Sequence, residues 1–269
     1  MLAFQKYIFM QPKNLFCLVT VLFTMCHGKK LSEPKNFTTL IKPNNTYYTY
    51  YSNIYAIPTP KGFTRIPQPI HTFGNWLHQI GLKNNNTVYL YNEQVKKNQT
   101  AQFAVLDIPV GDKDLQQCAD AVMRLRASYL FEEKKYDDII FFDNEQKVYQ
   151  FTAPYTLAHL TTYLNQVFSY CGTASLAKQL QAKNIATMQA GDVFIRGGFP
   201  GHAVIVIDMA EDSTGQKIFM LAQSYMPAQS IHILVNPIDK KNMPWYVLTN
   251  GDFLYTPEYT FTKNELKGW

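Results

Sequence analysis

Cysteine is scarce in this chain: its 269 residues contain only four, at positions 17, 26, 118 and 171. This excludes a scaffold held together by disulfides, because such small folds need far more cysteines per residue. Long hydrophobic runs are scarce as well. The run Leu15–Met25 is shorter than the roughly 20 residues that a permanent membrane-spanning helix needs.

A stripe of basic residues is also missing. The net charge is +5 at pH 7, and the lysine pairs are interleaved with acids, as where Lys134–Lys135 follow Glu132–Glu133. Nucleic-acid binding is therefore not expected. The histidines are scattered without metal-ligand spacing, and the glycine-rich stretch 191–201 lacks the Gly-Lys-Ser/Thr ending of a phosphate loop. We therefore expect neither a cofactor nor a metal.

The remaining composition is that of a folded domain. With 46% hydrophobic and 14% aromatic residues, the chain can bury a sizeable core. Its 14 prolines and 13 glycines are spread along the sequence, which argues against a coiled coil or a helical array. We expect a signal segment at 1–28, a tether with an extended segment at 29–62, and a single α+β domain at 63–269.

The first 28 residues have the layout of an export signal. Lys6 and Lys13 precede the apolar run, which ends in Cys26-His27-Gly28. Either Cys26 carries a lipid anchor, or cleavage after Gly28 releases the protein. Both alternatives predict an exported protein, in the periplasm or associated with the outer membrane. A start at Met10 would give a more compact signal, so whether residues 1–9 are translated stays open, as does the oligomeric state.

Apolar residues spaced three and four apart predict the main helices. The clearest stripe is Leu115, Cys118, Val122, Leu125 and Tyr129, with Asp112 or Asp114 as the cap; the second is Leu157, Leu160, Leu164, Val167 and Cys171. Shorter helices are expected at 73–82 and from Thr173 to about Lys183. Strands are expected at 87–91, 102–108, 139–143, 192–196, 202–208, 217–223, 231–235 and 245–249. Helices followed by an antiparallel meander predict an α+β fold.

Cys171 is the thiol to which we give a chemical role. It lies just before Gly172 and the expected cap Thr173, where the positive end of a helix would stabilise a thiolate. His202 follows a glycine-rich loop and opens an apolar strand, and Gln223 ends the next strand. We expect these three to meet as nucleophile, base and orienting group.

Structural alternatives stay open for each of these residues. Cys171 also continues the apolar stripe of its helix, and His202 could simply be a hydrogen-bonded strand end. Cys118 lies on an apolar stripe, which favours a buried inert thiol over a disulfide with Cys171. His232 alternates with Ile231 and Ile233, and is either a surface residue or a second imidazole in the sheet.

Five further residues are candidates for binding. The loop 197–201 brings backbone close to the site through Gly198 and Gly201. Tyr225 follows Gln223 by two residues. Asp120 and Arg124 lie four residues apart on one helix, a spacing more often found in a helix-supporting pair than in an anion clamp.

Three stretches carry a resemblance to a known family: 115–126 (LQQCADAVMRLR), 191–203 (GDVFIRGGFPGHA) and 221–229 (LAQSYMPAQ). They resemble the bacterial family catalogued as domain of unknown function 4846, over roughly residues 63–262. The resemblance implies a secreted or lipid-anchored bacterial protein and supplies no activity.

A second resemblance is local. A cysteine near a helix start, a Gly-Asp-Val-Phe strand and a Gly-His strand followed by a strand with a polar end are similar to papain-like amidases of the CHAP and NlpC type. It implies a papain-like core and a thiol amidase or peptidase that cuts peptidoglycan peptides. Cys171 would then be the nucleophile, His202 the base and Gln223 the orienting group. The alternative is a non-catalytic envelope module that binds peptide or glycan in the same pocket.

Overall fold

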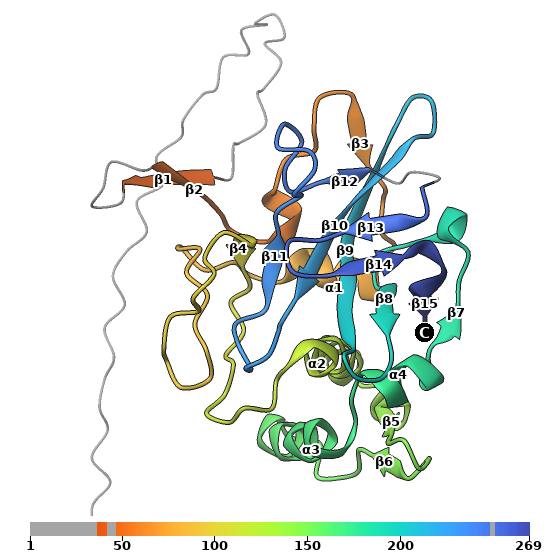
Figure 1. The fold of residues 1–269 in the computed structure, drawn as a ribbon. Coiled ribbons are helices and arrows are strands. Elements are labelled where there is room, and N and C mark those ends of the chain that lie inside the picture. Colours follow the sequence, from red (N-terminus) through yellow and green to blue (C-terminus); the bar gives the residue numbers. More distant parts are fainter. Residues whose placement is uncertain (1–36, 42–46, 248–250) are drawn as a thin grey trace, which may run out of the picture. The chain divides into compact units, whose positions relative to one another are not determined.

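The computed structural model describes residues 37–41, 47–247 and 251–269 (Figure 1). The expected signal segment lies outside these residues. None of the helices in the described ranges is long and apolar enough to cross a membrane. The core begins earlier than the expected boundary at residue 63, because Ile54 and Ile57 are fully buried within it.

A nine-stranded antiparallel sheet organises the fold. Its order is β4-β11-β10-β9-β8-β15-β7, with β12 also pairing β10 and β3 also pairing β9. The consecutive strands β8 to β11 form the predicted meander. The sheet strands are β3 (Phe63–Arg65), β4 (Gln102–Val105), β7 (Gln181–Ala182), β8 (Val193–Arg196), β9 (His202–Asp212), β10 (Lys217–Gln223), β11 (His232–Leu234), β12 (Tyr246–Val247) and β15 (Leu266–Gly268).

Three separate hairpins accompany the sheet in the ranges that the structure describes. They pair β1 (Phe37–Ile41) with β2 (Tyr47–Tyr51), β5 (Ile140–Phe142) with β6 (Val148–Gln150), and β13 (Phe253–Tyr255) with β14 (Thr260–Thr262). The strand expected at 87–91 is wrong: this segment makes only single bridges to Val95 and Gln229, and β4 pairs with β11 instead.

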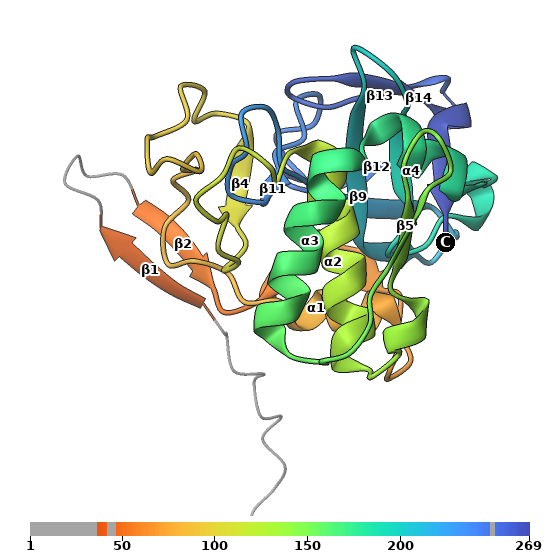
Figure 2. The same cartoon turned by 90° about the horizontal axis from the view of Figure 1, so that it is seen from below.

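Four α-helices lie in the described residues: α1 (Phe73–Gln79), α2 (Cys118–Glu132), α3 (Leu157–Tyr170) and α4 (Thr173–Gln179). Helix α2 packs on β9, and α3 lies beside α2 (Figure 2). Because α3 covers it, α2 is buried nearly all round, and even the charged residue Asp120 is buried.

The helix starts also differ from the prediction. Gln117, rather than Asp112 or Asp114, is the N-cap of α2, and its N–H donates to Asp120 Oδ2 at 3.0 Å. The N-cap of α4 is Gly172, one residue before the expected Thr173, and its N–H donates to Ser175 Oγ at 3.0 Å. Asp120 and Ser175 thus satisfy backbone donors at the two helix starts.

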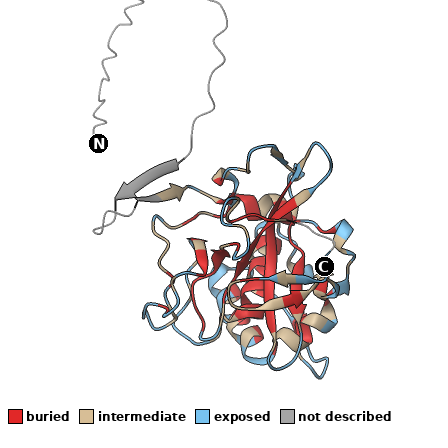
Figure 3. Cartoon of the chain, turned by 45° about the horizontal axis from the view of Figure 1, so that its top comes forward, coloured by how far each residue is buried: buried red, intermediate tan, exposed pale blue. Residues whose placement is uncertain are grey.

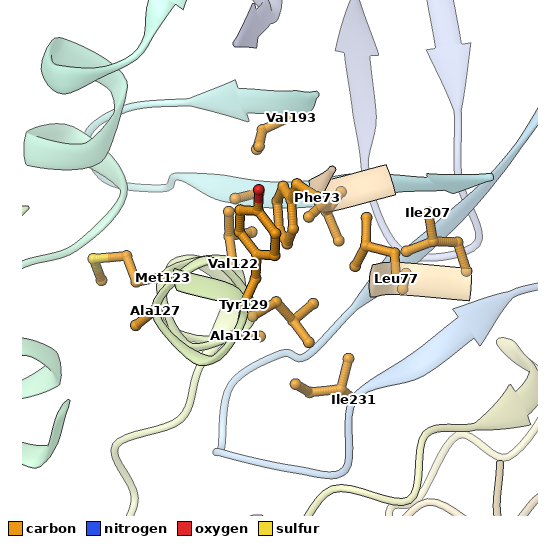
Figure 4. Close-up of a cluster of buried hydrophobic side chains, with 14 of the residues drawn as sticks. Phe73, Leu77, Ala121, Val122, Met123, Ala127, Tyr129, Val193, Ile207 and Ile231 are labelled. Carbon is orange, nitrogen blue, oxygen red and sulfur yellow. The ribbon is translucent and has the colours of Figure 1, made fainter. Parts of the chain in front are cut away.

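Both faces of the central strands are covered, which explains their continuous apolar sequences. In β9, Ala203, Ile205 and Ile207 belong to the cluster under the helices, whereas Val204 and Val206 pack in a second cluster on the opposite face. Figure 3 shows the buried strands at the centre of the fold, and Figure 4 shows the side chains between α1, α2 and the sheet.

Candidate functional site

The structure brings His202 and Gln223 together, as the sequence predicts. His202 is the first residue of β9 and Gln223 the last residue of the neighbouring strand β10. The His202 Nε2 atom lies 2.8 Å from Gln223 Oε1. Both side chains are buried, with exposed fractions of 2% and 1%.

A buried ion pair fixes the orientation of the Gln223 amide. Gln223 Nε2 donates to Glu258 Oε2 at 2.8 Å, and the same oxygen accepts from Lys96 Nζ at 2.7 Å. Since a carboxylate only accepts, the Gln223 nitrogen must face Glu258 and its oxygen must face His202. Neither Glu258 nor Lys96 was a candidate, because they lie far from each other in the sequence and carry no local motif.

This arrangement sets the tautomer of His202. Gln223 Oε1 can only accept, so His202 Nε2 carries the proton. In the neutral ring, Nδ1 then holds a free lone pair, and no hydrogen bond occupies it within the described residues. Burial lowers the pKa of His202 to about 4, despite the opposing effects of Gln223 and Glu258. At pH 7 the imidazole is therefore neutral and can accept a proton at Nδ1.

His232 is the second imidazole of the sheet, and the alternative of a surface position is wrong. Its exposed fraction is 0%, and it is the register partner of Gln223. Its Nδ1 donates to Ser230 O at 2.9 Å, which leaves Nε2 to accept from Gln223 Nε2 at 3.5 Å. Burial lowers the pKa of His232 to about 4, so it too is neutral.

Cys171 lies at the carboxyl end of a helix. It is the C-cap of α3, and its N–H donates to Val167 O at 2.7 Å. Burial, together with Asp143 and Asp120, raises the pKa of its thiol to about 12. The negative end of α3 disfavours a thiolate, whereas the start of α4, whose N-cap is the next residue Gly172, favours one. Within the described part of the chain no hydrogen bond joins Cys171 to His202, and its catalytic role stays a prediction.

Cys118 occupies the position that favours a reactive thiol. It is the first residue of α2, at the positive end of a 15-residue helix. Burial and Asp120 raise the pKa of Cys118 to about 11, while the N–H groups of Ala119 and Ala203 act in the opposite direction. Ala203 directly follows His202 in β9. The thiol that approaches the histidine strand is therefore Cys118.

Tyr225 packs on the imidazole. Its ring centroid lies 4.7 Å from that of His202, and the nearby Cys118 contributes to raising its pKa. No hydrogen bond joins Cys118 to His202 among the described residues. The apolar stripe extends back to Leu115, so the periodicity predicts an earlier helix start and does not indicate that Cys118 is the first helical residue. A helix start placed at Cys118 itself would have revealed a thiol at a helix N-terminus.

A cavity of about 220 Å³ opens beside the two thiols, and the buried His202 is not among its lining residues. It is lined by both thiols and by the predicted binding residues Asp120, Gly198 and Gly201, with Phe199 and Met226 also contributing. Phe199 is 95% exposed and Met226 51%. Asp120 Oδ1 is buried without a hydrogen-bond partner. The cavity thus combines apolar side chains with one unused acceptor beside the thiols.

Gly201 is required by close backbone packing. A Cβ there would collide with the carbonyl oxygens of Gly198 and Arg196 and with the Thr173 hydroxyl. Gly198 has a φ of +104°, in the region that favours glycine. The predicted close approach of the 197–201 loop to the site is present in this packing.

Arg124 has a role different from the expected pair with Asp120. Within the described residues no ion pair joins the two side chains. Arg124 Nη1 donates to Pro109 O at 2.6 Å and to the Gln116 side-chain oxygen, while Gln116 O accepts from Ser224 Oγ at 2.8 Å. These bonds hold the segment that leads into Cys118.

A second cavity, of about 240 Å³, lies beside Arg124. It shares Leu115 and Phe168 with the thiol cavity, so the two form adjoining depressions along α2 and α3. This shape fits an extended ligand better than a compact one.

Cys118 and Cys171, the two cysteines in the described part of the chain, are free and buried, and no disulfide joins them. The family model described as domain of unknown function (4846) matches residues 54–153 and 143–268. The chain belongs to this family. The match starts at Ile54, where the core also starts. Neither a curated protein nor a solved structure matches.

Proposed function

We propose that this member of family 4846 is a thiol hydrolase that cleaves amide bonds in an extended peptide. The observation that carries the proposal is the convergence of a helix N-terminal thiol, Cys118, on the strand that begins with His202. The hydrogen bond to Gln223 fixes the tautomer of His202, so that its Nδ1 carries the lone pair that accepts a proton. We assign the nucleophile to Cys118, rather than to the expected Cys171, because of this convergence.

At rest the Cys118 thiol is protonated and the His202 imidazole is neutral. The imidazole therefore has to act as a general base that removes the thiol proton during attack. As Cys118 Sγ attacks the substrate carbonyl carbon, its proton passes to His202 Nδ1. The tetrahedral intermediate then expels the amine, which takes the proton from the imidazolium, and a thioester remains on Cys118. Water hydrolyses the thioester, with His202 again accepting and returning the proton. The thiol–imidazole hydrogen bond would form only with substrate in place, since catalytic hydrogen bonds are often long or absent in the free enzyme.

Positive dipoles at the start of α2 support the negative charge that develops during attack. The N–H groups of Cys118 and Ala119 act on the sulfur in the resting state. The first-turn N–H groups of a helix have no intrahelical partner, so they are available to an oxyanion. Gln223 and Glu258 stabilise the imidazolium through Nε2–H.

The adjoining cavities support a peptide as the substrate. An extended chain could lie along Phe168 and Leu115 and pass Cys118 toward Phe199. The basic flank and apolar run at the N-terminus support export, with or without a lipid anchor at Cys26. We therefore propose peptides of the bacterial cell envelope, including peptidoglycan peptides, as the substrates of an exported enzyme with a papain-like arrangement.

Digestion of purified peptidoglycan by matched cysteine variants tests the proposal, with products identified by mass. Wild type and Cys171→Ala should release the same fragments at rates within about threefold of each other. In Cys118→Ala the rate of release should fall at least about a thousandfold. If Cys171→Ala loses the release of fragments and Cys118→Ala retains it, the nucleophile is Cys171. Binding of fragments without release by any of the three would leave the alternative, a non-catalytic module for peptide or glycan.

A further inference from the structure

A third cavity surrounds Arg126, which plays no part in the proposed chemistry. Arg126 lies eight residues after Cys118, about 12 Å further along the axis of α2. Its cavity of about 560 Å³ is lined by residues from α1, α2, the 189–192 segment and the chain's last residue. These include Phe73, Arg126, Tyr129, Lys135, Asp192 and Trp269.

The guanidinium of Arg126 lies among three aromatic rings. Its Cζ atom is 5.3 Å from the ring centroid of Phe73, 5.4 Å from that of Tyr129 and 5.1 Å from that of Trp269. Figure 4 shows Phe73 and Tyr129 side by side, and their ring centroids are 5.2 Å apart. The rings give the cavity flat apolar walls and hold the cation by their negative faces.

Arg126 has no bonded anionic partner among the described residues, and the exposed Asp138 acts on it only at longer range. Within the described residues it forms neither a hydrogen bond nor an ion pair, and its Nε atom is buried without a partner. Of the other charged groups that line the cavity, Asp192 has an ion-pair partner, whereas Lys135 bonds only a neutral hydroxyl. Asp192 bonds Lys183 at 2.8 Å, and Lys135 Nζ donates to the Tyr129 hydroxyl at 3.3 Å. His71 faces Glu133 at 3.0 Å.

An unpaired guanidinium in a partly buried position is costly, because its donors lose water without gaining an acceptor. Burial accordingly lowers the pKa of Arg126. A carboxylate would satisfy two of its N–H donors at once, since the guanidinium fork matches the spacing of the two oxygens. Arg126 supplies this fork, Lys135 adds a second cation to the cavity wall, and the charge of Asp192 is paired with Lys183.

We propose that the Arg126 cavity binds a monocarboxylate with an apolar or aromatic body. The carboxylate pairs with Arg126, and the body lies against Phe73, Tyr129 and Trp269. This site is separate from the thiol cavity and does not depend on the proposed hydrolase activity. Its ligand could be a free carboxylic acid or the C-terminal carboxylate of a peptide, which share this chemistry.

Isothermal titration of the purified full chain with 3-phenylpropionate tests the proposal. The wild type should bind one equivalent, and 3-phenylpropionamide, which has the same shape without the charge, should bind at least about tenfold more weakly. Arg126→Gln should bind 3-phenylpropionate more weakly than wild type by the same factor. The control Lys147→Gln also removes a cation stacked on two tyrosine rings, outside this cavity, and should bind like wild type.

Equal binding of acid and amide, or no binding of the acid, would overturn the proposal. Stronger binding of inorganic phosphate than of 3-phenylpropionate would also overturn it. Because acid and amide are compared on the wild-type protein, the result stands even if Arg126→Gln fails to fold. Titration with N-acetyl-phenylalanine and its amide then distinguishes a peptide end from a simple acid, since only a peptide site should prefer the acetylated amino acid.

Discussion

The Lys96–Glu258 pair offers the sharpest test of how the site is held. The pair is nearly buried, with side-chain exposed fractions of 9% and 13%, and Glu258 Oε2 also accepts from Gln223. Replacing Glu258 by Leu leaves Lys96 as an unpaired cation and frees the Gln223 amide to rotate. Removing one partner of a buried pair typically costs about 3–5 kcal/mol, so we expect a loss in that range for Glu258→Leu and for Lys96→Met.

The double variant Lys96→Met/Glu258→Leu separates the ion pair from the amide. Because no charge is left unpaired, its unfolding free energy should lie within about 2 kcal/mol of wild type. The rate at which the double variant hydrolyses amide bonds should still fall about tenfold or more, since Gln223 no longer has a fixed orientation to hold His202. Urea unfolding followed by circular dichroism gives the stabilities. The role assigned to this pair would be refuted if the loss of unfolding free energy in the double variant equalled the sum of the two single losses. Full activity in the double variant would refute it as well.

Three further predictions follow from other contacts. Asp208→Ala should cost about 3–5 kcal/mol in urea unfolding, because the buried carboxylate bonds Arg65 Nε at 2.7 Å and a histidine Nε2 at 2.8 Å; a loss below 1 kcal/mol would contradict this. Iodoacetamide labelling of Cys118 should rise about tenfold per pH unit between pH 7 and 9, since a thiol with a pKa raised to about 11 ionises only as pH approaches that value; a plateau below pH 7 would reveal a preformed thiolate. Gly201→Ala should cost about 1–3 kcal/mol through backbone collision, whereas Gly172→Ala, with open space at its Cβ, should leave the melting temperature nearly unchanged.

Much of the sheet was predictable because its strands carry continuous apolar sequence. The range predicted for β10 matches its observed bounds, and β8 starts one residue later than expected. Alternation could not reveal which face each residue uses, since both faces are buried. The segment 87–91 shows the limit. Its β-forming residues suggested a strand, yet its backbone groups pair with loops rather than with β4.

The site was predictable in part for the same reason. His202 and Gln223 lie at the adjoining ends of neighbouring strands, which the meander alone implies. The choice between the two cysteines depended on where helices start. One turn of error in the start of α2 hid the N-terminal position of Cys118, whereas Cys171 lies as predicted between the end of α3 and the start of α4. The partners of Gln223 come from distant loops, so no local pattern could indicate them.

Acylation by 4-nitrophenyl acetate tests the central claim most directly, because it reports on the thiol and the imidazole without knowledge of the natural substrate. Mass spectrometry of the digested protein gives the acetylation rate of each cysteine separately. We expect Cys118 to be acetylated faster than Cys171, and His202→Ala to slow Cys118 at least about tenfold while leaving Cys171 unchanged. Equal rates at Cys118 in wild type and His202→Ala would contradict the pairing of this thiol with this imidazole.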